Sequence, residues 1–259
     1  MKSLTNYNNK NITESFHDFQ EFSITERVQQ VKIYAIGDLH LSGNPPTKPM
    51  TIFGEHWNDH WHKIKASWLS LVHAEDAVIL CGDISWGMHL DEALADLNAI
   101  ADLPGKKIIL RGNHDYWWST IKKMTNATNE NFLFLQNNFF AIGNTAICGT
   151  RGWNLPGNEF FTPEDEAIYR RECLRLEASL QLASAAGFSD IVVALHYPPL
   201  YTGVEDSGFT ELCEKYQVRT CIFGHVHGED AKNAFQGLKA GINYQIVAAD
   251  AVNFSLQEI

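Results

Sequence analysis

The sequence predicts an α/β fold, and two observations carry this prediction. Five short runs of apolar, largely β-branched residues end in glycine or a polar residue, as buried strands do. Between several of these runs, apolar residues recur three and four positions apart, which is typical of amphipathic helices. The chain of 259 residues shows no internal repeat and no low-complexity linker, so we expect a single α/β domain over residues 31–259.

A polar segment precedes the expected strands. Residues 1–30 have little periodicity, and we expect them to be a flexible or irregular leader. The five runs expected to be strands are Val31 to Ile36, Ala77 to Cys81, Lys107 to Arg111, Asp190 to Leu195, and Thr220 to Phe223. Strands and turns are also expected over residues 234–240 and 244–249, near the end of the chain.

Three helices are expected between the strands. The first two span residues 57–73 and 89–103, where apolar residues have helical spacing. The third runs from Pro163 to about Ala186 and has the clearest signals. Thr162 is expected to cap this helix, and proline suits its first turn because the missing N–H has no intrahelical partner there.

The composition limits the partners of the chain. The sequence has 20 Lys and Arg against 31 Asp and Glu, a net charge of −11 with His neutral. This charge disfavours binding along a nucleic-acid backbone or an anionic membrane. No run approaches the roughly 18 apolar residues of a membrane helix, and no secretory signal is recognised. The five cysteines form no CxxC pair, which indicates reduced thiols in a cytoplasmic protein.

Polar clusters follow all five expected strands. They are Gly37-Asp38-Leu39-His40, Gly82-Asp83, Gly112-Asn113-His114-Asp115, His196, and Gly224-His225-Val226-His227. Strand ends are where α/β sheets usually place their sites. Asp, His and Asn supply the oxygen and nitrogen ligands that borderline divalent metals accept. In both Asp-x-His and His-x-His, residues two apart on an extended segment point the same way, so both could reach one metal.

The specificity of this signal lies in the combination. A lone Asp-x-His or His-x-His is more often a surface loop or a hydrogen-bonded core histidine. The ordered set of five clusters, each after an expected strand, resembles the calcineurin-like metallophosphoesterase superfamily from about Val31 to Ala249. This resemblance implies a two-sheet β-sandwich flanked by helices, a fold of four layers, and the hydrolysis of phosphoesters.

The resemblance also implies the site residues. One metal ion would be held by Asp38, His40, Asp83 and His227. A second would be held by Asp83, Asn113, His196 and His225, so that Asp83 bridges the two ions. His114 matches the histidine that contacts the scissile phosphate or protonates the leaving group, and Asp115 would orient His114.

The expected charges agree with this implied site. Two divalent ions with the carboxylates of Asp38 and Asp83 sum to about +2, which attracts a phosphate dianion even on an acidic chain. Metals about 3.5–4 Å apart lower the pKa of a shared water and clamp the phosphoryl oxygens. We expect a hydroxide bridging two ions of Mn²⁺, Fe²⁺ or Zn²⁺ to attack the phosphorus directly. No cysteine or serine nucleophile is then required.

Substrate contacts are predicted from weaker signals. Arg111 and Arg151 border glycine-containing clusters, and a guanidinium fork suits phosphate oxygens. The alternative for both is a structural salt bridge or a solvated side chain, and Arg151 is favoured over Arg111 as a phosphate contact. Residues 45–73 lengthen the interval between the first two clusters. This segment indicates an exposed amphipathic helix, or else a cap that turns His60 or Trp57 toward the phosphate.

Together these features predict a cytoplasmic phosphohydrolase that cleaves a small phosphomonoester or phosphodiester, such as a nucleotide. A nuclease using the same site would need a basic track, and the sequence has no run of Lys and Arg. A phosphoprotein phosphatase would need an open groove. A non-catalytic, protein-binding member of the fold would have lost ligands, whereas Asp83 and His114 are both present. The oligomeric state is not predicted.

Overall fold

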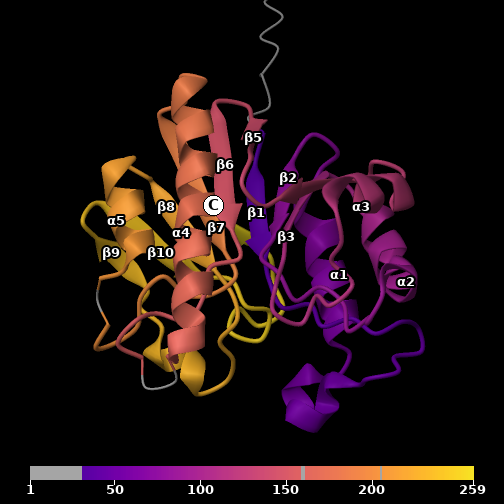
Figure 1. Ribbon diagram of the computed structural model, residues 1–259. Coiled ribbons are helices and arrows are strands. Elements are labelled where there is room, and N and C mark those ends of the chain that lie inside the picture. The colour runs from indigo at the N-terminus through magenta and orange to yellow at the C-terminus, as the bar shows by residue number, and fades with distance from the viewer. Residues whose placement is uncertain (1–30, 159–160, 205) are drawn as a thin grey trace, which may run out of the picture. The chain divides into compact units, whose positions relative to one another are not determined.

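Two β-sheets pack face to face in the structure, and helices cover the outer face of each sheet (Figure 1). The structure is a computed structural model that describes residues 31–158, 161–204 and 206–259. The predicted α/β fold of two sheets flanked by helices is confirmed. The leader predicted for residues 1–30 lies outside the described residues.

The first sheet contains β1 (Ile33–Ile36), β2 (Ala77–Leu80), β3 (Lys106–Leu110), β4 (Phe132–Leu135) and β11 (Gln257–Glu258). Its strand order is β11-β1-β2-β3-β4. The strands β1 to β4 are parallel, and β11 pairs antiparallel with β1. The strands β1, β2 and β3 correspond to expected runs, whereas β4 and β11 were not expected from the sequence.

The second sheet contains β5 (Phe139–Ile142), β6 (Thr145–Thr150), β7 (Asp190–Leu195), β8 (Thr220–Phe223), β9 (Gly237–Lys239) and β10 (Ile242–Ile246). Its order is β5-β6-β7-β8-β10-β9. The four central strands are parallel, and the edge strands β5 and β9 pair antiparallel. The strands β7 and β8 match the expected runs, and β5 and β6 were missed.

The helices are α1 (His60–Leu71), α2 (Leu90–Ala101), α3 (Ile121–Ala127), α4 (Pro163–Ala185) and α5 (Gly208–Lys215). Short 3₁₀ turns form η1 (Met50–Phe53), η2 (Glu55–Trp57) and η3 (Asp230–Asn233). Helix α4 begins after Thr162 as expected, and a capping box forms there, in which the Thr162 backbone N–H donates to Asp165 at 2.8 Å. No helix in the described residues is long and apolar enough to cross a membrane.

The helix expected over residues 57–73 is wrong at its start. Asp59 has a left-handed backbone with φ of 53°, so the chain turns between η2 and α1 and the helix begins at His60. Trp57 therefore belongs to η2, outside the helix. Trp57 is nevertheless buried in the same apolar cluster as Ile64 and Trp68 of α1.

Alternating side chains produce the layers. On β1, Ile33 and Ala35 join the apolar cluster between the two sheets. Tyr34 and Ile36 point to the other side and join the cluster that includes Trp68 of α1. A corresponding cluster packs α4 and α5 on the outer face of the second sheet.

The two sheets are joined at one edge by backbone hydrogen bonds. The Gly37 N–H donates to the Val247 carbonyl at 2.7 Å, and the Ala249 N–H donates to the Gly37 carbonyl at 3.1 Å. The carboxyl end of β1 is thereby held beside the carboxyl end of β10. The polar loops that follow the parallel strands of both sheets consequently face one another at this edge.

Candidate metal centre

Five loops bring the predicted ligands together at the carboxyl ends of the parallel strands. Asp38 and His40 follow β1, Asp83 follows β2, and Asn113 follows β3. The second sheet contributes His196 after β7, and His225 and His227 after β8. The side chains of Asp38, His40, Asp83 and His196 are buried. Charged and imidazole groups are rarely buried unless they are paired or bind a metal.

Four of these residues have an unusual backbone. Asp38, His40, Asp83 and His225 all lie in the left-handed region, with φ between 47° and 75°. Such conformations cost about 1–3 kcal/mol each and persist where the surrounding structure fixes them, often at functional sites. Backbone hydrogen bonds hold them here, because the Asp38 N–H donates to the Gly82 carbonyl and the His40 N–H to the Asp83 carbonyl, both at 2.9 Å.

Two motif glycines are required by close approach of the carboxylates. A Cβ atom on Gly112 would lie 2.0 Å from Asp83 Oδ1, and one on Gly224 would lie 2.3 Å from Asp38 Oδ2. Real Cβ atoms do not approach other atoms so closely. Any side chain at either position would therefore displace a predicted metal ligand.

The first group of donor atoms comes from Asp38, His40 and His227, which lie within 4.8 Å of one another. His227 Nε2 is 3.5 Å from Asp38 Oδ1. A second group consists of Asp38, Asp83 and His196. The two oxygens of Asp83 serve different neighbours, because Oδ2 lies 3.8 Å from His40 Nε2 and Oδ1 lies 3.6 Å from His196 Nε2.

Asn113 completes the second group. Its Oδ1 lies 2.7 Å from His196 Nε2 and 2.9 Å from His225 Nδ1. The other ring nitrogen of His196, Nδ1, lies 2.9 Å from the Cys81 carbonyl oxygen. Burial lowers the pKa of His196 to about 3, so the ring is neutral and carries one N–H. That single N–H can donate to only one of the two oxygens. The other ring nitrogen therefore directs its own lone pair at an oxygen that also carries lone pairs.

This excess of acceptors fits a cation. Burial, together with the negative charges of Asp115 and Asp38, raises the pKa of Asp83 well above its usual value. Burial also lowers the pKa of both His40 and His225 to about 3, which keeps them neutral. Neutral imidazoles that converge with crowded carboxylates are the donor set that a borderline divalent metal accepts. The residues present therefore fit divalent metal ions.

The sequence analysis missed Asp250. Its Oδ1 accepts a hydrogen bond from His227 Nδ1 at 2.8 Å, and its Oδ2 accepts one from the Gly228 N–H at 3.0 Å. Burial opposes protonation of His227, but the hydrogen bonds to Asp250 and Asp38 outweigh it and raise the pKa to about 10. A carboxylate on Nδ1 fixes the ring so that Nε2 faces the candidate metal position. The only sequence signal was an acid directly after an expected strand.

Asp115 has different contacts from those expected. Its fully buried carboxylate accepts hydrogen bonds from the Gly112 N–H at 2.7 Å, the Asp83 N–H at 2.9 Å and the Trp117 indole at 2.9 Å. Within the described residues, no hydrogen bond joins it to His114, whose buried Nδ1 has no partner there. The expectation that Asp115 orients His114 is thus corrected. Asp115 instead binds the loops after β2 and β3 together.

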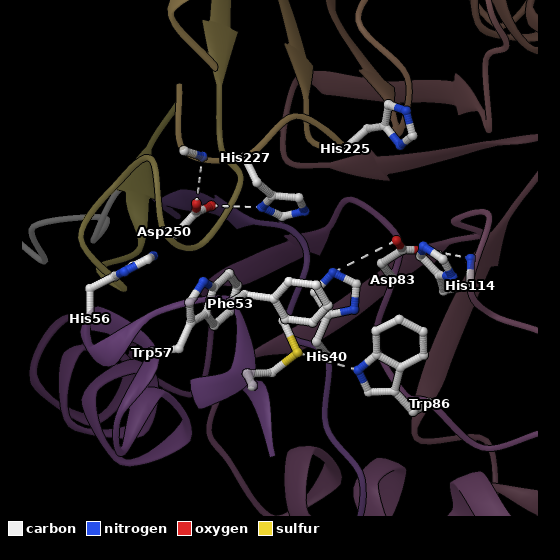
Figure 2. Close-up of a pocket in the computed structure, with 12 residues that line it drawn as sticks. His40, Phe53, His56, Trp57, Asp83, Trp86, His114, His225, His227 and Asp250 are labelled. Atoms are coloured by element: carbon white, nitrogen blue, oxygen red, sulfur yellow. Dashed lines mark hydrogen bonds and ion pairs between the residues drawn. The ribbon is translucent and has the colours of Figure 1, made fainter. Parts of the chain in front are cut away.

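A pocket of about 270 Å³ opens beside these ligands (Figure 2). Its polar wall includes His40, Asp83, His225, His227 and Asp250, with His114 beside Asp83. Its other wall comes from the inserted segment and the β2 loop and is formed by Met50, Phe53, His56, Trp57 and Trp86. Trp57 therefore lines the pocket, as the cap alternative for residues 45–73 predicted.

Three predicted substrate contacts do not line this pocket. His60 is half-buried, and its Nε2 lies 3.0 Å from the Leu39 carbonyl oxygen, where it supports the loop that carries Asp38 and His40. It does not line the pocket of about 270 Å³, but it lines an adjoining cavity of about 750 Å³ together with His40 and Trp57. Arg111 and Arg151 line a separate cavity with none of the predicted metal ligands. Arg111 follows β3, which was expected, whereas Arg151 follows β6, which was missed. The sequence held no information on the side to which either arginine points.

Comparisons with known proteins place this geometry in a family. No curated protein sequence matches the chain significantly. Among solved structures, TT1561 of Thermus thermophilus is 12% identical, with a TM-score of 0.54 over 88% of this chain and 98% of that chain. A protein of unknown function, AQ665 from Aquifex aeolicus, is 17% identical, with a TM-score of 0.47 over 88% and 95% of the two chains. Identities this low concern the fold alone.

A match between the sequence and a family model identifies the family. The family model for calcineurin-like phosphoesterases matches residues 31–229, which is most of the chain. This range contains all seven predicted metal ligands, which the structure gathers at one edge of the two sheets. The chain therefore belongs to the calcineurin-like phosphoesterase family and is a metal-dependent phosphoesterase.

Proposed function

We propose that this protein is a dinuclear-metal phosphohydrolase that cleaves a phosphomonoester or phosphodiester of a small molecule. The observation that carries the proposal is the arrangement of donors around Asp83. Its two carboxylate oxygens lie toward His40 on one side and His196 on the other, as a bridging carboxylate requires. Asp38 belongs to both groups of converging donor atoms, and Asp83 belongs to the second.

The chain's residues divide into two ligand sets under this proposal. Asp38, His40, Asp83 and His227 would hold one ion, and Asp83, Asn113, His196 and His225 the other. Two bound divalent ions supply Lewis-acid stabilisation of the phosphoryl oxygens and lower the pKa of a water. The Cys81 carbonyl and Asp250 each bind the Nδ1 of a ligand histidine, which orients the Nε2 lone pair inward.

The charges of the residues that line the pocket support a metal-dependent reaction. No lysine or arginine is found among the described residues that line it, although the substrate is an anion. Positive charge for the phosphate must then come from the ions and from histidine. His114 lies in the pocket with its ring 4.6 Å from Trp86 and 5.8 Å from His40.

His114 is proposed to contact the phosphate and to protonate the leaving group. Its buried Nδ1 lacks a partner in the described part of the chain, as expected of a group whose partner is a ligand. Burial lowers the pKa of His114, while the charge of Asp38 acts in the opposite direction. A bound phosphate dianion adds to the second effect, so His114 would take up a proton as the substrate binds.

The aromatic wall indicates the shape of the substrate. Phe53, Trp57 and Trp86 line a pocket of about 270 Å³, which suits a compact leaving group with a flat apolar part. Such a surface can stack a nucleobase as well as a simple aromatic ring. The acidic chain disfavours a nucleic-acid substrate, and the pocket of about 270 Å³ has room for a small molecule.

Turnover of two chromogenic esters tests the proposal. Metal-stripped protein is supplied with Mn²⁺, Zn²⁺ or Mg²⁺ and assayed with p-nitrophenyl phosphate and bis-p-nitrophenyl phosphate. We expect metal-dependent turnover that is lost in Asp83→Asn and kept in Asp230→Asn, an exposed matched control. The preferred ester would assign the protein to monoesters or diesters. Turnover that is independent of metal, or that survives in Asp83→Asn, would refute the proposal.

A further inference from the structure

A second cavity lies apart from the metal centre. It has a volume of about 230 Å³ and lies between helix α4 and the carboxyl ends of β3, β4 and β6. Four arginines line it: Arg111 after β3, Arg151 after β6, and Arg171 and Arg175 on α4. It shares no lining residue with the pocket beside the candidate metal ligands.

The charge of this cavity is unusual for an acidic chain. Four guanidinium groups against the one carboxylate of Glu172 leave a net lining charge of +3, whereas the whole chain carries −11. Because like charges repel more strongly where water is partly excluded, a compensating anion is favoured beside the buried guanidinium of Arg151, whereas Arg171 and Arg175 are partly solvated. Glu172 supplies only part of that compensation.

Glu172 is already fully engaged. It is completely buried, and its Oε2 accepts a hydrogen bond from Thr150 Oγ1 at 2.5 Å. Its Oε1 accepts one from Arg175 Nη1 at 2.7 Å and lies 3.5 Å from Arg171 Nε and 4.0 Å from Arg151 Nη2. The carboxylate therefore positions three arginines around the cavity without satisfying all of their donors.

Unsatisfied donors remain on two of the arginines. The Nε atoms of Arg111 and Arg151 are buried and have no hydrogen-bond partner among the described residues. The Arg151 side chain is only 13% exposed to solvent, and its guanidinium lies 4.2 Å from the centre of the Trp153 ring. Burial lowers the pKa of Arg151, the charge of Glu172 opposes this shift, and the charge of Arg111 adds to it. Buried unpaired donors usually mark the position of an ion or water.

We propose that this cavity binds a phosphate-type oxyanion, as a site separate from the metal centre. Guanidinium forks match the oxygens of phosphate, which can accept hydrogen bonds from several arginines at once. The volume suffices for one tetrahedral anion and several waters, since a water occupies about 30 Å³ of liquid. The anion is either free inorganic phosphate or the phosphoryl group of a small ester.

The cavity is connected to the metal centre through the backbone. The Arg151 carbonyl accepts hydrogen bonds from the N–H groups of both His196 and Tyr197 at 3.0 Å. Arg111 directly precedes Gly112, whose N–H donates to Asp115. An anion held by both arginines would thus bind two loops that carry candidate metal ligands, which gives the second site a route to influence the first.

Calorimetric titration of inorganic phosphate into the full-length, metal-loaded protein at constant ionic strength tests this inference. We expect two binding events, one at the metal centre and one at the arginine cavity. Asp83→Asn should lose the first and keep the second, so a failure of the proposed function is distinguishable from a failure of this inference. A parallel titration with glycerol phosphate separates the two sources: an ester that binds like phosphate assigns the site to phosphoryl groups in general, and binding of phosphate alone assigns it to the free anion.

The variants are chosen to spare the fold. Arg171 is half-exposed and Arg111 has no ion pair in the described residues, whereas Arg175 is the close partner of Glu172 and is left intact. Arg111→Gln and Arg171→Gln should each weaken the second event about tenfold, which corresponds to about 1.4 kcal/mol.

Arg170→Gln is the matched control. Arg170 pairs with Glu166 on the exposed face of α4 and does not line the cavity, so it should keep both binding events. Thermal unfolding of each variant verifies the fold. A second event that is absent from wild type, or equally strong in Arg170→Gln and the two cavity variants, would overturn the inference.

Discussion

Replacing Asp115 with Asn should destabilise the protein as well as weaken its metal centre. The carboxylate accepts backbone hydrogen bonds on both oxygens: Oδ2 from Gly112 and Asp83, and Oδ1 from Ile84, with the Trp117 indole. An amide has only one acceptor oxygen. Whichever way it is placed, its NH₂ group meets at least two buried donors that lose their acceptor.

The size of the effect follows from these contacts. A buried donor without an acceptor costs about 1–3 kcal/mol, and losing the desolvated charge of Asp115 offsets part of the total. We expect a loss of about 3 kcal/mol in the free energy of unfolding. For a chain of this size, this corresponds to a fall in Tm of about 6–12 °C.

Thermal unfolding followed by circular dichroism measures this change, with His114→Ala as the comparison. His114 supplies no side-chain acceptor to a buried backbone N–H in the described structure, so its removal should lower the Tm by less than about 3 °C while impairing turnover. If Asp115→Asn instead impairs turnover with an unchanged Tm, Asp115 acts on His114 and the reasoning from the loop contacts is refuted.

Three further predictions concern the centre and its pocket. Gly224→Ala places a Cβ atom 2.3 Å from Asp38 Oδ2, so equilibrium dialysis should show loss of metal binding; wild-type stoichiometry would contradict the steric argument. Asp250→Asn removes the carboxylate from His227 Nδ1 and should weaken metal affinity about 10–100-fold in a competition with a chromogenic chelator, and an unchanged affinity would exclude this role. Trp57→Ala removes a wall of the pocket and should raise KM for p-nitrophenyl phosphate several-fold, but leave KM for glycerol phosphate nearly unchanged. Equal effects of Trp57→Ala on both substrates would argue against an aromatic subsite.

The parts of the fold that the sequence predicts are those with strong local patterns. The strands β1, β2, β3, β7 and β8 are buried apolar runs that end at motif residues, so their identity needed no tertiary information. The missed hairpin of β5 and β6 turns at Gly143-Asn144 between two apolar runs, which is a hairpin signal that the sequence does contain. The break before α1 depends on the left-handed backbone of Asp59, which helical spacing does not reveal.

Part of the candidate site is likewise predictable from local sequence patterns, and part depends on tertiary packing. The predicted ligands lie in local motifs after strands, and parallel topology then brings them to one edge. Asp250 is 23 residues away from His227, and their contact depends on how β10 is placed beside β8. The position of Arg111 after a strand was predicted, but the cavity that it shares with Arg151 was not, because that cavity depends on β6 and on the packing of α4 against the second sheet.

Metal content measured together with activity tests the central claim most directly. Metal-stripped protein is titrated with Mn²⁺ or Zn²⁺, and bound metal and the initial rate with p-nitrophenyl phosphate or its diester are recorded at each ratio. The account predicts two ions per chain, a rate that rises until the second ion binds, and at most one ion with no turnover in Asp83→Asn. Full activity with a single bound ion, or two bound ions in Asp83→Asn, would contradict it.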